Sequence, residues 1–334
     1  MNKPLRVVMI GAGHRANAAI YPSFADLRGE GLIDIVGVCD IDPQRLHATA
    51  DQYGIPNRYG DNRYIYEYRA MIENLNPDAA VVIGQPHIMY DIWMWCLEQG
   101  LHLYIEKPMA LTLHQARALE AVARRKGLVT QVSLQRRYTP MVTQLREEAL
   151  ERGPLTHAVC KFYKSNPQDC LEAHDHMMDD TVHAIDTLRW MTGSEVAHID
   201  SATRRVGTVD INFIMAQMTF ENGAVGHLMN NWSSGKRIFA VEMHAPGVYI
   251  EAEHETKGYL YADGSLTPRV YDAAECAGSD AVHIKSGVYA AAKGFVLSCL
   301  HGGQPMANFT STLQTMKVAE TILAQALLAE ANVK

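Results

Sequence analysis

The chain has 334 residues, which is enough for two domains that each bury a core. Apolar residues make up 48% of it and charged residues 20%, an ordinary globular composition, and no apolar run reaches the length of a membrane-spanning helix. The net charge of −7 gives no electrostatic reason to bind a polyanion. We therefore expect neither a nucleic acid nor a membrane as a partner.

Six scattered cysteines, with no C-x-x-C pair among them, indicate reduced and mostly buried thiols rather than a disulfide framework. The apolar run Leu5–Ile10 leads directly into a glycine turn, so it predicts a strand and not a signal peptide. Together these features predict a cytoplasmic protein.

Short apolar runs and amphipathic segments alternate along the first 133 residues. Strands are expected at Leu5–Ile10, Ile33–Cys39, Ala79–Ile83, His102–Ile105 and Val129–Ser133. Helices are expected at about Ala16–Gly29, Pro43–Tyr53, Tyr66–Asn74, Met89–Gln99 and Thr112–Lys126. Single strands separated by helices predict parallel pairing through right-handed crossovers, hence an α/β domain with a doubly wound sheet over residues 1–134.

A G-x-G-x-x-A motif lies where the first strand meets the first helix, at Gly11-Ala-Gly13-His-Arg-Ala16. Gly11 permits the tight turn, Gly13 lets the backbone approach a pyrophosphate, and Ala16 is small enough for the helix to pack on the strand. A glycine turn without a nucleotide is the alternative, but the strand–turn–helix context favours a Rossmann dinucleotide site. The expected cofactor contacts here are Gly11, Ala12, Gly13, His14 and Arg15.

Asp40 ends the second strand, where an acid accepts hydrogen bonds from the adenosine ribose hydroxyls and repels a 2′-phosphate. The nearest arginine that could neutralise such a phosphate is Arg45, which we expect on the following helix. The sequence therefore predicts NAD rather than NADP, with Asp40 and Arg45 among the cofactor-binding residues.

Glu106-Lys107-Pro108 follows the strand His102–Ile105, so these side chains are expected at the ligand-binding edge of the sheet. A lysine there can donate a hydrogen bond or a proton to a substrate oxygen. Taken alone, a surface lysine in a loop is the commoner outcome.

Three motifs in chain order resemble the Gfo/Idh/MocA oxidoreductase family. They are the G-x-G-x-x-A turn, the E-K-P after a later strand, and the Q-R-R-Y run at Gln135–Tyr138. A fourth segment, Asp179-x-x-x-His183-x-x-Asp186 followed by Gly193, is similar to the family's D-x-x-x-H helix. The resemblance covers nearly the whole chain and looks nearest to the MviM-like branch.

Asp179 and His183 are four residues apart, so on a helix they share one face, with Asp186 further along it. A carboxylate beside an imidazole orients it for general-base work. From the spacing alone, a structural acid and a core histidine remain an open alternative. The resemblance implies that Lys107, Asp179 and His183 converge on the substrate as catalytic residues, while Asp186 supports the helix.

The chain also departs from the family pattern. Where the family usually carries a Thr-Pro and a later histidine, this chain has Gly84-Gln85-Pro86-His87. We still expect the nicotinamide end of the cofactor near this loop. The remaining expected cofactor contacts are Gly84, Gln85, His87, Glu106, Lys107 and Gln135.

Where many members have a glycine pair before the D-x-x-x-H helix, this chain has His174-Asp-His176-Met-Met-Asp179-Asp180. These residue types also suit zinc or manganese, but four ligands in one short segment seldom share one coordination geometry without a tight loop. We expect substrate-lining histidines and no metal. The expected substrate-binding residues are Arg136, Tyr138, His174, His176 and Trp232, and for Arg136, Tyr138 and Trp232 ordinary packing is an equal alternative.

Longer alternating runs follow residue 155 and predict an α+β domain with a large, mostly antiparallel sheet, over residues 135–334. Strands are expected at Thr156–Tyr163, Ile199–Val206, Asn212–Phe220, Ala224–Asn231, Arg237–His244, Tyr249–Ala252 and Tyr259–Tyr261, and closing helices at Val282–Leu300 and Ser311–Ala329. Asn222-Gly223 is a hairpin signal between two of these strands. An open sheet face needs a cover, which predicts a homodimer or homotetramer formed through this sheet.

The leading hypothesis is an NAD-dependent dehydrogenase that oxidises or reduces a secondary hydroxyl or ketone of a sugar, polyol or related small molecule. In it His183 takes the hydroxyl proton, Lys107 stabilises the alkoxide and Asp179 orients the pair. A second hypothesis is an enzyme that retains NAD and uses transient oxidation for elimination or glycosidic cleavage. The third is a ligand sensor without catalysis, which has no need of an acid/base group.

Overall fold

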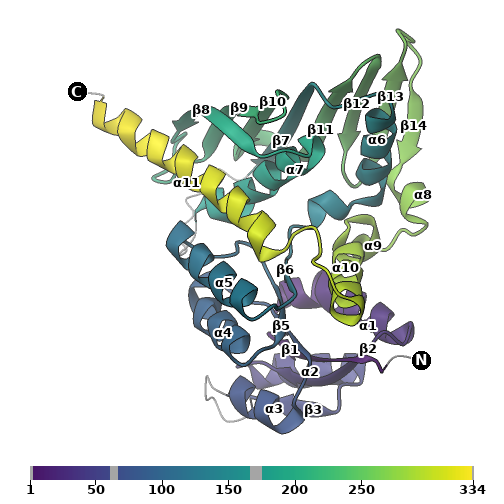
Figure 1. Ribbon diagram of the computed structural model, residues 1–334, viewed down its shortest axis with the longest axis vertical. Coiled ribbons are helices and arrows are strands. Elements are labelled where there is room, and N and C mark those ends of the chain that lie inside the picture. The colour runs from purple at the N-terminus through teal and green to yellow at the C-terminus, as the bar shows by residue number, and fades with distance from the viewer. Residues whose placement is uncertain (1–2, 61–66, 166–174, 333–334) are drawn as a thin grey trace. The chain divides into compact units, whose positions relative to one another are not determined.

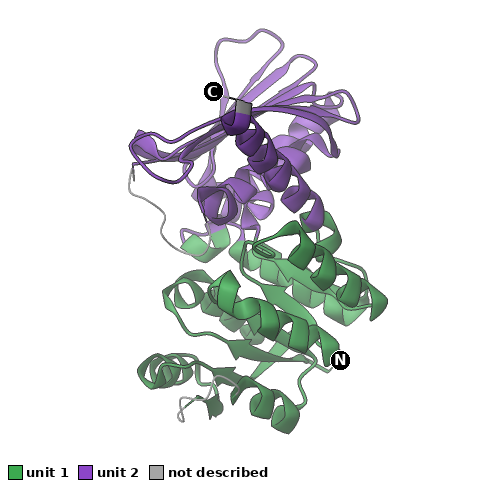
Figure 2. Cartoon of the chain, turned by 90° about the vertical axis from the view of Figure 1, so that its left-hand side faces the viewer, with its two compact units in different colours: residues 1–133, 282–284, 288–312 green, residues 134–281, 285–287, 313–334 purple. Residues whose placement is uncertain are grey.

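The computed structural model describes residues 3–60, 67–165 and 175–332, and it divides into two compact units (Figure 2). The first unit holds residues 1–133, 282–284 and 288–312, and the second holds residues 134–281, 285–287 and 313–334. Among the described residues, no helix is long and apolar enough to cross a bilayer.

A six-stranded parallel sheet forms the centre of the first unit, with strand order β3-β2-β1-β4-β5-β6 (Figure 1). This order is typical of dinucleotide-binding domains. The chain adds strands on one side of β1 as far as β3 and then continues on the other side from β4, so the order reverses between β1 and β4. The strands are β1 (Leu5–Ile10), β2 (Ile33–Cys39), β3 (Asn57–Tyr59), β4 (Ala79–Val82), β5 (His102–Ile105) and β6 (Thr130–Val132). The helices between them are η1 (Ala16–Ile20), α1 (Tyr21–Gly29), α2 (Pro43–Tyr53), α3 (Glu67–Leu75), α4 (Pro86–Glu98) and α5 (Leu113–Arg125). The predicted doubly wound sheet is confirmed.

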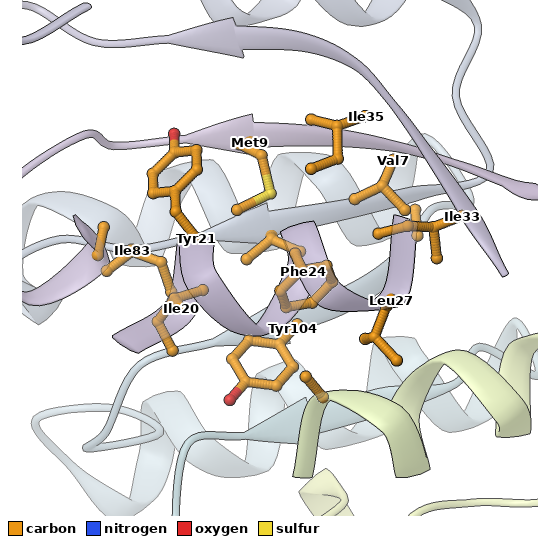
Figure 3. Packing of buried hydrophobic residues seen from close by; sticks show 14 of the residues in the cluster. Val7, Met9, Ile20, Tyr21, Phe24, Leu27, Ile33, Ile35, Ile83 and Tyr104 are labelled. Carbon is orange, nitrogen blue, oxygen red and sulfur yellow. The ribbon is translucent and has the colours of Figure 1, made fainter. Parts of the chain in front are cut away.

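Aliphatic and aromatic side chains from β1, β2 and α1 form the core of this unit (Figure 3). Phe24 of α1 is completely buried, and its ring lies edge-on to that of Tyr104 in β5, 5.6 Å between centroids. Burying a side chain of this size contributes about 1.5–3 kcal/mol. The core therefore fixes α1, and with it the turn that precedes η1 and α1.

The predicted single helix Val282–Leu300 is wrong, because the structure divides it into α9 (Val282–Lys285) and α10 (Val288–His301). Gly287 separates the two, with a φ of 86° that favours glycine. A Cβ there would lie 2.5 Å from the carbonyl oxygen of Gln135. After this break the chain returns to the first unit, where Phe295 of α10 packs against Tyr104. The first unit therefore extends beyond the expected boundary at residue 134.

The second unit is built on an eight-stranded sheet of order β14-β13-β12-β11-β7-β10-β9-β8. All of its pairings are antiparallel except that of β10 with β7, which agrees with the predicted mostly antiparallel sheet. The strands are β7 (His157–Ser165), β8 (Val196–Arg204), β9 (Phe213–Phe220), β10 (Val225–Asn231), β11 (Ser233–Ala245), β12 (Val248–Glu253), β13 (Lys257–Ala262) and β14 (Arg269–Asp272). The helices are η2 (Gln135–Tyr138), α6 (Pro140–Glu151), η3 (Met177–Thr181), α7 (Val182–Thr192), α8 (Ala273–Ala277) and α11 (Phe309–Asn332), and the last begins in the first unit.

Helices α6 and α7 lie against one face of this sheet, α7 over β7 and β10 and α6 over β11 to β13 (Figure 1). The alternation of buried residues with half-buried or exposed ones along β9 to β12 follows from this one-sided packing. Helix α6 was not predicted, although Pro140 at its first position is a usual helix start.

Candidate functional site

In the first unit, the turn after β1 has the shape that a dinucleotide requires. Gly11 has a φ of 96°, and a Cβ on it would lie 1.9 Å from the carbonyl oxygen of Ile83. At Gly13, by contrast, no atom lies within 4 Å of where a Cβ would be. The first glycine is needed to close the turn, and the second leaves open space in front of the helix start, where a pyrophosphate binds in this type of fold.

The segment after the glycine turn begins with a π-helical turn, η1, and continues as α1. The side-chain amide of Asn17 donates to the carbonyl oxygen of Ala12 (2.7 Å) and to the hydroxyl of Thr49 (3.0 Å). These bonds hold the turn against α2. Short π-helical segments of this kind occur frequently at functional sites.

Asp40 follows β2 and closes the other side of this turn. Its Oδ2 accepts a hydrogen bond from the amide of Ala12 (2.6 Å), its Oδ1 accepts one from the amide of Asp42 (2.8 Å), and its side chain is almost buried. A carboxylate has about four acceptor positions, so two remain for ribose hydroxyls. Arg45 lies 3.6 Å from Asp40 and 3.1 Å from Asp42. The guanidinium of Arg45 thus already lies beside two carboxylates, and these disfavour the binding of the 2′-phosphate of NADP at this position.

Glu106 and Lys107 follow β5 at the same edge of the sheet. The buried Glu106 carboxylate accepts from Nε of Arg15 (3.1 Å) and from the amide of Lys107 (3.2 Å). The peptide between Lys107 and Pro108 is cis. Glu106 therefore connects the turn after β5 with the turn after β1, and it positions the backbone of the half-buried Lys107.

The loop after β4 carries the remaining predicted contacts of this unit. Gln85 precedes the first residue of α4, and both Gln85 and His87 are exposed. A Cβ on Gly84 would contact the side chain of Met89 at 2.5 Å. The structure thus brings the predicted residues after β1, β2, β4 and β5 to the carboxyl edge of one parallel sheet, while Gln135 lies in η2 of the second unit.

In the second unit, the D-x-x-x-H motif lies at the junction of η3 with α7. Asp179 is half-buried in the π-helical turn, and its amide donates to the carbonyl of Asp175 (2.8 Å). His183 is almost buried in the first turn of α7, and its carbonyl accepts from the hydroxyl of Thr187 (2.7 Å). The motif is therefore interrupted by a change of helix type, which the four-residue spacing did not predict.

Asp186, the last residue of the motif, is paired within the core. Its Oδ2 accepts from Nε of Arg137 (2.7 Å), its Oδ1 accepts from a second nitrogen of the same guanidinium, and Thr315 also donates to Oδ1 (3.1 Å). Both charged side chains are almost fully buried. Asp186 thus joins α7 to η2 and α11.

The predicted substrate residues have partners inside the second unit. Nδ1 of His176 lies 2.5 Å from Oδ2 of Asp210, and the indole of the fully buried Trp232 donates to Asp180 (3.0 Å). Arg136 pairs with Glu255 and lies over the ring of Phe239, and Tyr138 is buried in the same 3-10 turn. His174 lies outside the described residues. Burial and hydrogen bonding indicate a structural contribution of Trp232 within this unit.

Two features of this region were missed by sequence reasoning. Asp210 lies in the loop after β8, 34 residues from His176, and no local pattern connects the two. Lys164, near the end of β7, pairs with Asp180, and its position in a strand carries no signal of this contact. The described residues contain no group of three potential ligands arranged to hold a metal ion.

Comparison with known proteins assigns both units to one family. Residues 5–134 match the model described as "Oxidoreductase family, NAD-binding Rossmann fold", and residues 150–245 match the "GFO/IDH/MocA C-terminal domain". The two matches together cover about two thirds of the chain. The chain belongs to the Gfo/Idh/MocA oxidoreductase family, and its first unit is the family's NAD-binding domain.

The individual relatives share low sequence identity with this chain or match only part of it. D-glucoside 3-dehydrogenase of Escherichia coli is 32% identical over 147 residues, which are 44% of this chain and 39% of that enzyme. A solved levoglucosan dehydrogenase with NADH and levoglucosan has a TM-score of 0.83 at 18% identity, over 97% of each chain. A dehydrogenase labelled MviM from Clostridium difficile has a TM-score of 0.80 at 19% identity, over 96% of this chain and 99% of that one. At such identities the structures share the fold alone, and the narrower MviM-like assignment stays a prediction.

Proposed function

We propose that this protein is an NAD-dependent dehydrogenase that acts on a secondary hydroxyl, or the corresponding ketone, of a sugar or polyol. The observation that carries the proposal is the placement of the family's three chemistry-bearing residues on ordered elements. Lys107 follows β5 at the cofactor edge of the first unit, whereas Asp179 in η3 and His183 in the first turn of α7 belong to the second. The dehydrogenation of D-glucosides by a relative supports a sugar as the substrate class.

The bound nicotinamide supplies a hydride acceptor or donor, which is chemistry that side chains lack. In the proposed mechanism the imidazole of His183 removes the proton from the substrate hydroxyl. The ammonium of Lys107 stabilises the negative charge that develops on the same oxygen. Asp179 is the residue that we propose to orient His183 for this transfer.

We further propose that a second copy of this chain covers the sheet face opposite α6 and α7. Five half-buried aromatic or imidazole side chains cross neighbouring strands on that face: His227, His157, His244, Tyr249 and Tyr261. Continuous ring contacts across five strands form a surface rich in aromatic and imidazole groups, and aromatic residues are enriched in the cores of interfaces between subunits. Analytical ultracentrifugation tests this, since a monomer at micromolar concentration contradicts it.

The activity is tested by measuring NAD reduction with methyl β-D-glucopyranoside, levoglucosan and myo-inositol, and NADH oxidation with the matching ketones. We expect NADH to form with at least one of them and the Asp179→Asn variant to be slower by about a hundredfold or more. Cleaved or eliminated product without free NADH would replace the proposal by the NAD-retaining mechanism. NAD binding without any reaction across a broad sugar panel would indicate a sensor.

A further inference from the structure

His176, which precedes the motif residues in the sequence, forms an imidazole–carboxylate pair with Asp210. His176 is the residue before η3, and Asp210 lies in the loop between β8 and β9. Nδ1 of His176 is 2.5 Å from Oδ2 of Asp210, and the amide of His176 points to the same oxygen at 3.4 Å. Both side chains are largely buried, with 7% and 18% of their surface exposed. Such burial means that solvent screens the pair much less than it screens a surface pair.

The carboxylate determines which imidazole nitrogen carries the proton. Ionised Asp210 can only accept, so Nδ1 of His176 is the donor, and Nε2 of the neutral ring keeps its lone pair. Within the described part of the chain, no hydrogen bond involves Nε2 of His176. The pair thus presents an oriented hydrogen-bond acceptor.

The ring is held from a second side by Trp232. The two ring centroids are 4.5 Å apart, inclined at 55°. The indole N–H does not compete for the histidine, because it donates to Oδ2 of Asp180 (3.0 Å), which also accepts from Lys164. The orientation of His176 is therefore over-determined, as expected for a side chain that recognises a ligand by geometry.

His176 lies in the turn that leads to the proposed catalytic pair, Asp179 and His183. Asp175 accepts from the amide of Met178 through its carboxylate (2.9 Å) and from that of Asp179 through its carbonyl (2.8 Å). Burial raises the pKa of the Asp175 carboxyl, although the Met178 amide opposes this. Two residues, Met177 and Met178, separate His176 from Asp179, so the two side chains project from the same short turn.

We propose that Asp210 holds His176 as the Nδ1-protonated tautomer, and that Nε2 then accepts a hydrogen bond from a hydroxyl of the substrate that is not oxidised. This inference rests on the proposed function, since it takes Asp179 and His183 to face the same substrate. His176 is a specificity-determining residue in this account and Asp210 is a positioning residue. A buried acceptor with a fixed direction discriminates strongly against a substrate that lacks the matching hydroxyl, because the acceptor is then left unpaired.

The tautomer is tested by nitrogen-detected NMR of the full-length, NAD-loaded protein with ¹⁵N-labelled histidine, with His176→Asn used to assign the signal. We expect Nδ1 to carry the proton in the wild type and the Asp210→Ala variant to show a mixture of tautomers. The matched control is Asp200→Ala, which removes the carboxylate of the exposed pair between His198 and Asp200 (3.1 Å). A wild-type ring with its proton on Nε2 overturns the inference, whether or not any sugar is turned over.

The substrate contact is tested with methyl β-D-glucopyranoside and its singly deoxygenated analogues. His176→Asn keeps a donor toward Asp210 and removes the Nε2 acceptor together with the ring contact to Trp232, and it is expected to fold. We expect the wild type to favour the parent sugar over one analogue by about tenfold or more in kcat/KM, and the variant to lose that preference chiefly through KM. Turnover with the preference unchanged in His176→Asn overturns the inference and leaves the proposed function intact. Absence of NADH formation with every sugar overturns the proposed function. The NMR result then decides separately whether Asp210 fixes the tautomer of His176.

Discussion

Arg137 of the run Gln135–Tyr138 and Asp186 of α7 form an ion pair with two hydrogen bonds, in which Nε of Arg137 lies 2.7 Å from Oδ2 of Asp186. Only 6% and 1% of the two side chains is exposed. Thr315 of α11 and the guanidinium of Arg189, 3.8 Å away, complete the surroundings of the carboxylate. Two motifs that are 49 residues apart in the sequence are thereby joined inside the second unit.

Removing one partner of this pair is expected to destabilise the protein strongly. Asp186→Leu leaves the Arg137 charge buried without its counter-ion, which costs about 3–5 kcal/mol. The double variant Arg137→Met with Asp186→Leu replaces both charges by apolar groups and is expected to recover much of the loss. Urea denaturation followed by circular dichroism measures both. Additive losses in the double variant would show that the two residues do not act as a pair.

The two glycines of the cofactor turn are expected to respond differently to alanine. Gly11→Ala forces a Cβ against the carbonyl of Ile83 at a positive φ, so it should lower the free energy of unfolding by about 2 kcal/mol or more and abolish NAD binding. Gly13→Ala meets no protein atom, so stability should change by less than about 0.5 kcal/mol while NAD binding is still lost.

Thermal melts and NAD titration calorimetry separate these two outcomes. An unchanged NAD affinity in Gly13→Ala would contradict the proposed approach of a pyrophosphate to this backbone, because no other consequence of the substitution is expected.

Asp40 is expected to determine the choice between NAD and NADP. Its carboxylate has acceptor capacity left after the amides of Ala12 and Asp42, and it repels a 2′-phosphate. Asp40→Ser should therefore reduce the preference for NAD over NADP by about tenfold or more. Dissociation constants for both cofactors test this, with Asp51→Ser, on exposed α2 surface, as the control. An unchanged ratio would assign the selectivity to other residues.

Stability is expected to fall below pH 6.5 because the folded state lowers the pKa of His254 and of His157. Burial and the nearby Arg136 guanidinium lower the pKa of His254 well below 6.5, and burial with His244 and His227 lowers the pKa of His157. As the pH falls through 6.5, the unfolded chain takes up protons that the folded chain does not, so the folded state loses stability.

The variant His254→Leu removes the difference in proton uptake between the unfolded and folded chains that arises from His254, the more deeply buried of the two histidines. The loss of unfolding free energy between about pH 7 and about pH 5 should therefore be smaller in His254→Leu than in the wild type. The exposed His198→Gln variant is the control. An equal pH dependence in all three proteins would refute the assignment to His254.

Much of the first unit could be predicted because each of its signals is local. The bounds of β1, β2, β5 and α2 agree with the predicted segments, since buried parallel strands are continuous apolar runs and helix starts carry capping residues such as Asp42. The break at Gly287 was missed because its cause is the approach of the η2 backbone, which only the folded chain brings near.

In the candidate site, too, residues with a local sequence signal could be predicted, and residues brought together only by the fold could not. Lys107, Asp179 and His183 were found from motifs, because their spacing is carried along short segments. The partners of the neighbouring His176 and Asp180 were not, because Asp210 and Lys164 come from a distant loop and strand with no pattern of their own. Sequence reasoning therefore identified the proposed chemistry but not what holds it in place.

The most direct test of the account compares the turnover number and the NAD dissociation constant of Lys107→Ala with those of the wild type and of Lys126→Ala. Lys126 follows α5, at the end of the helix remote from the cofactor edge of the sheet, and it contacts the Glu98 carbonyl. With the best substrate of the sugar panel, we predict that Lys107→Ala lowers turnover by about a hundredfold or more and changes NAD affinity by less than about threefold. Equal losses of turnover and NAD affinity, or turnover as high as that of Lys126→Ala, would contradict the catalytic role of Lys107.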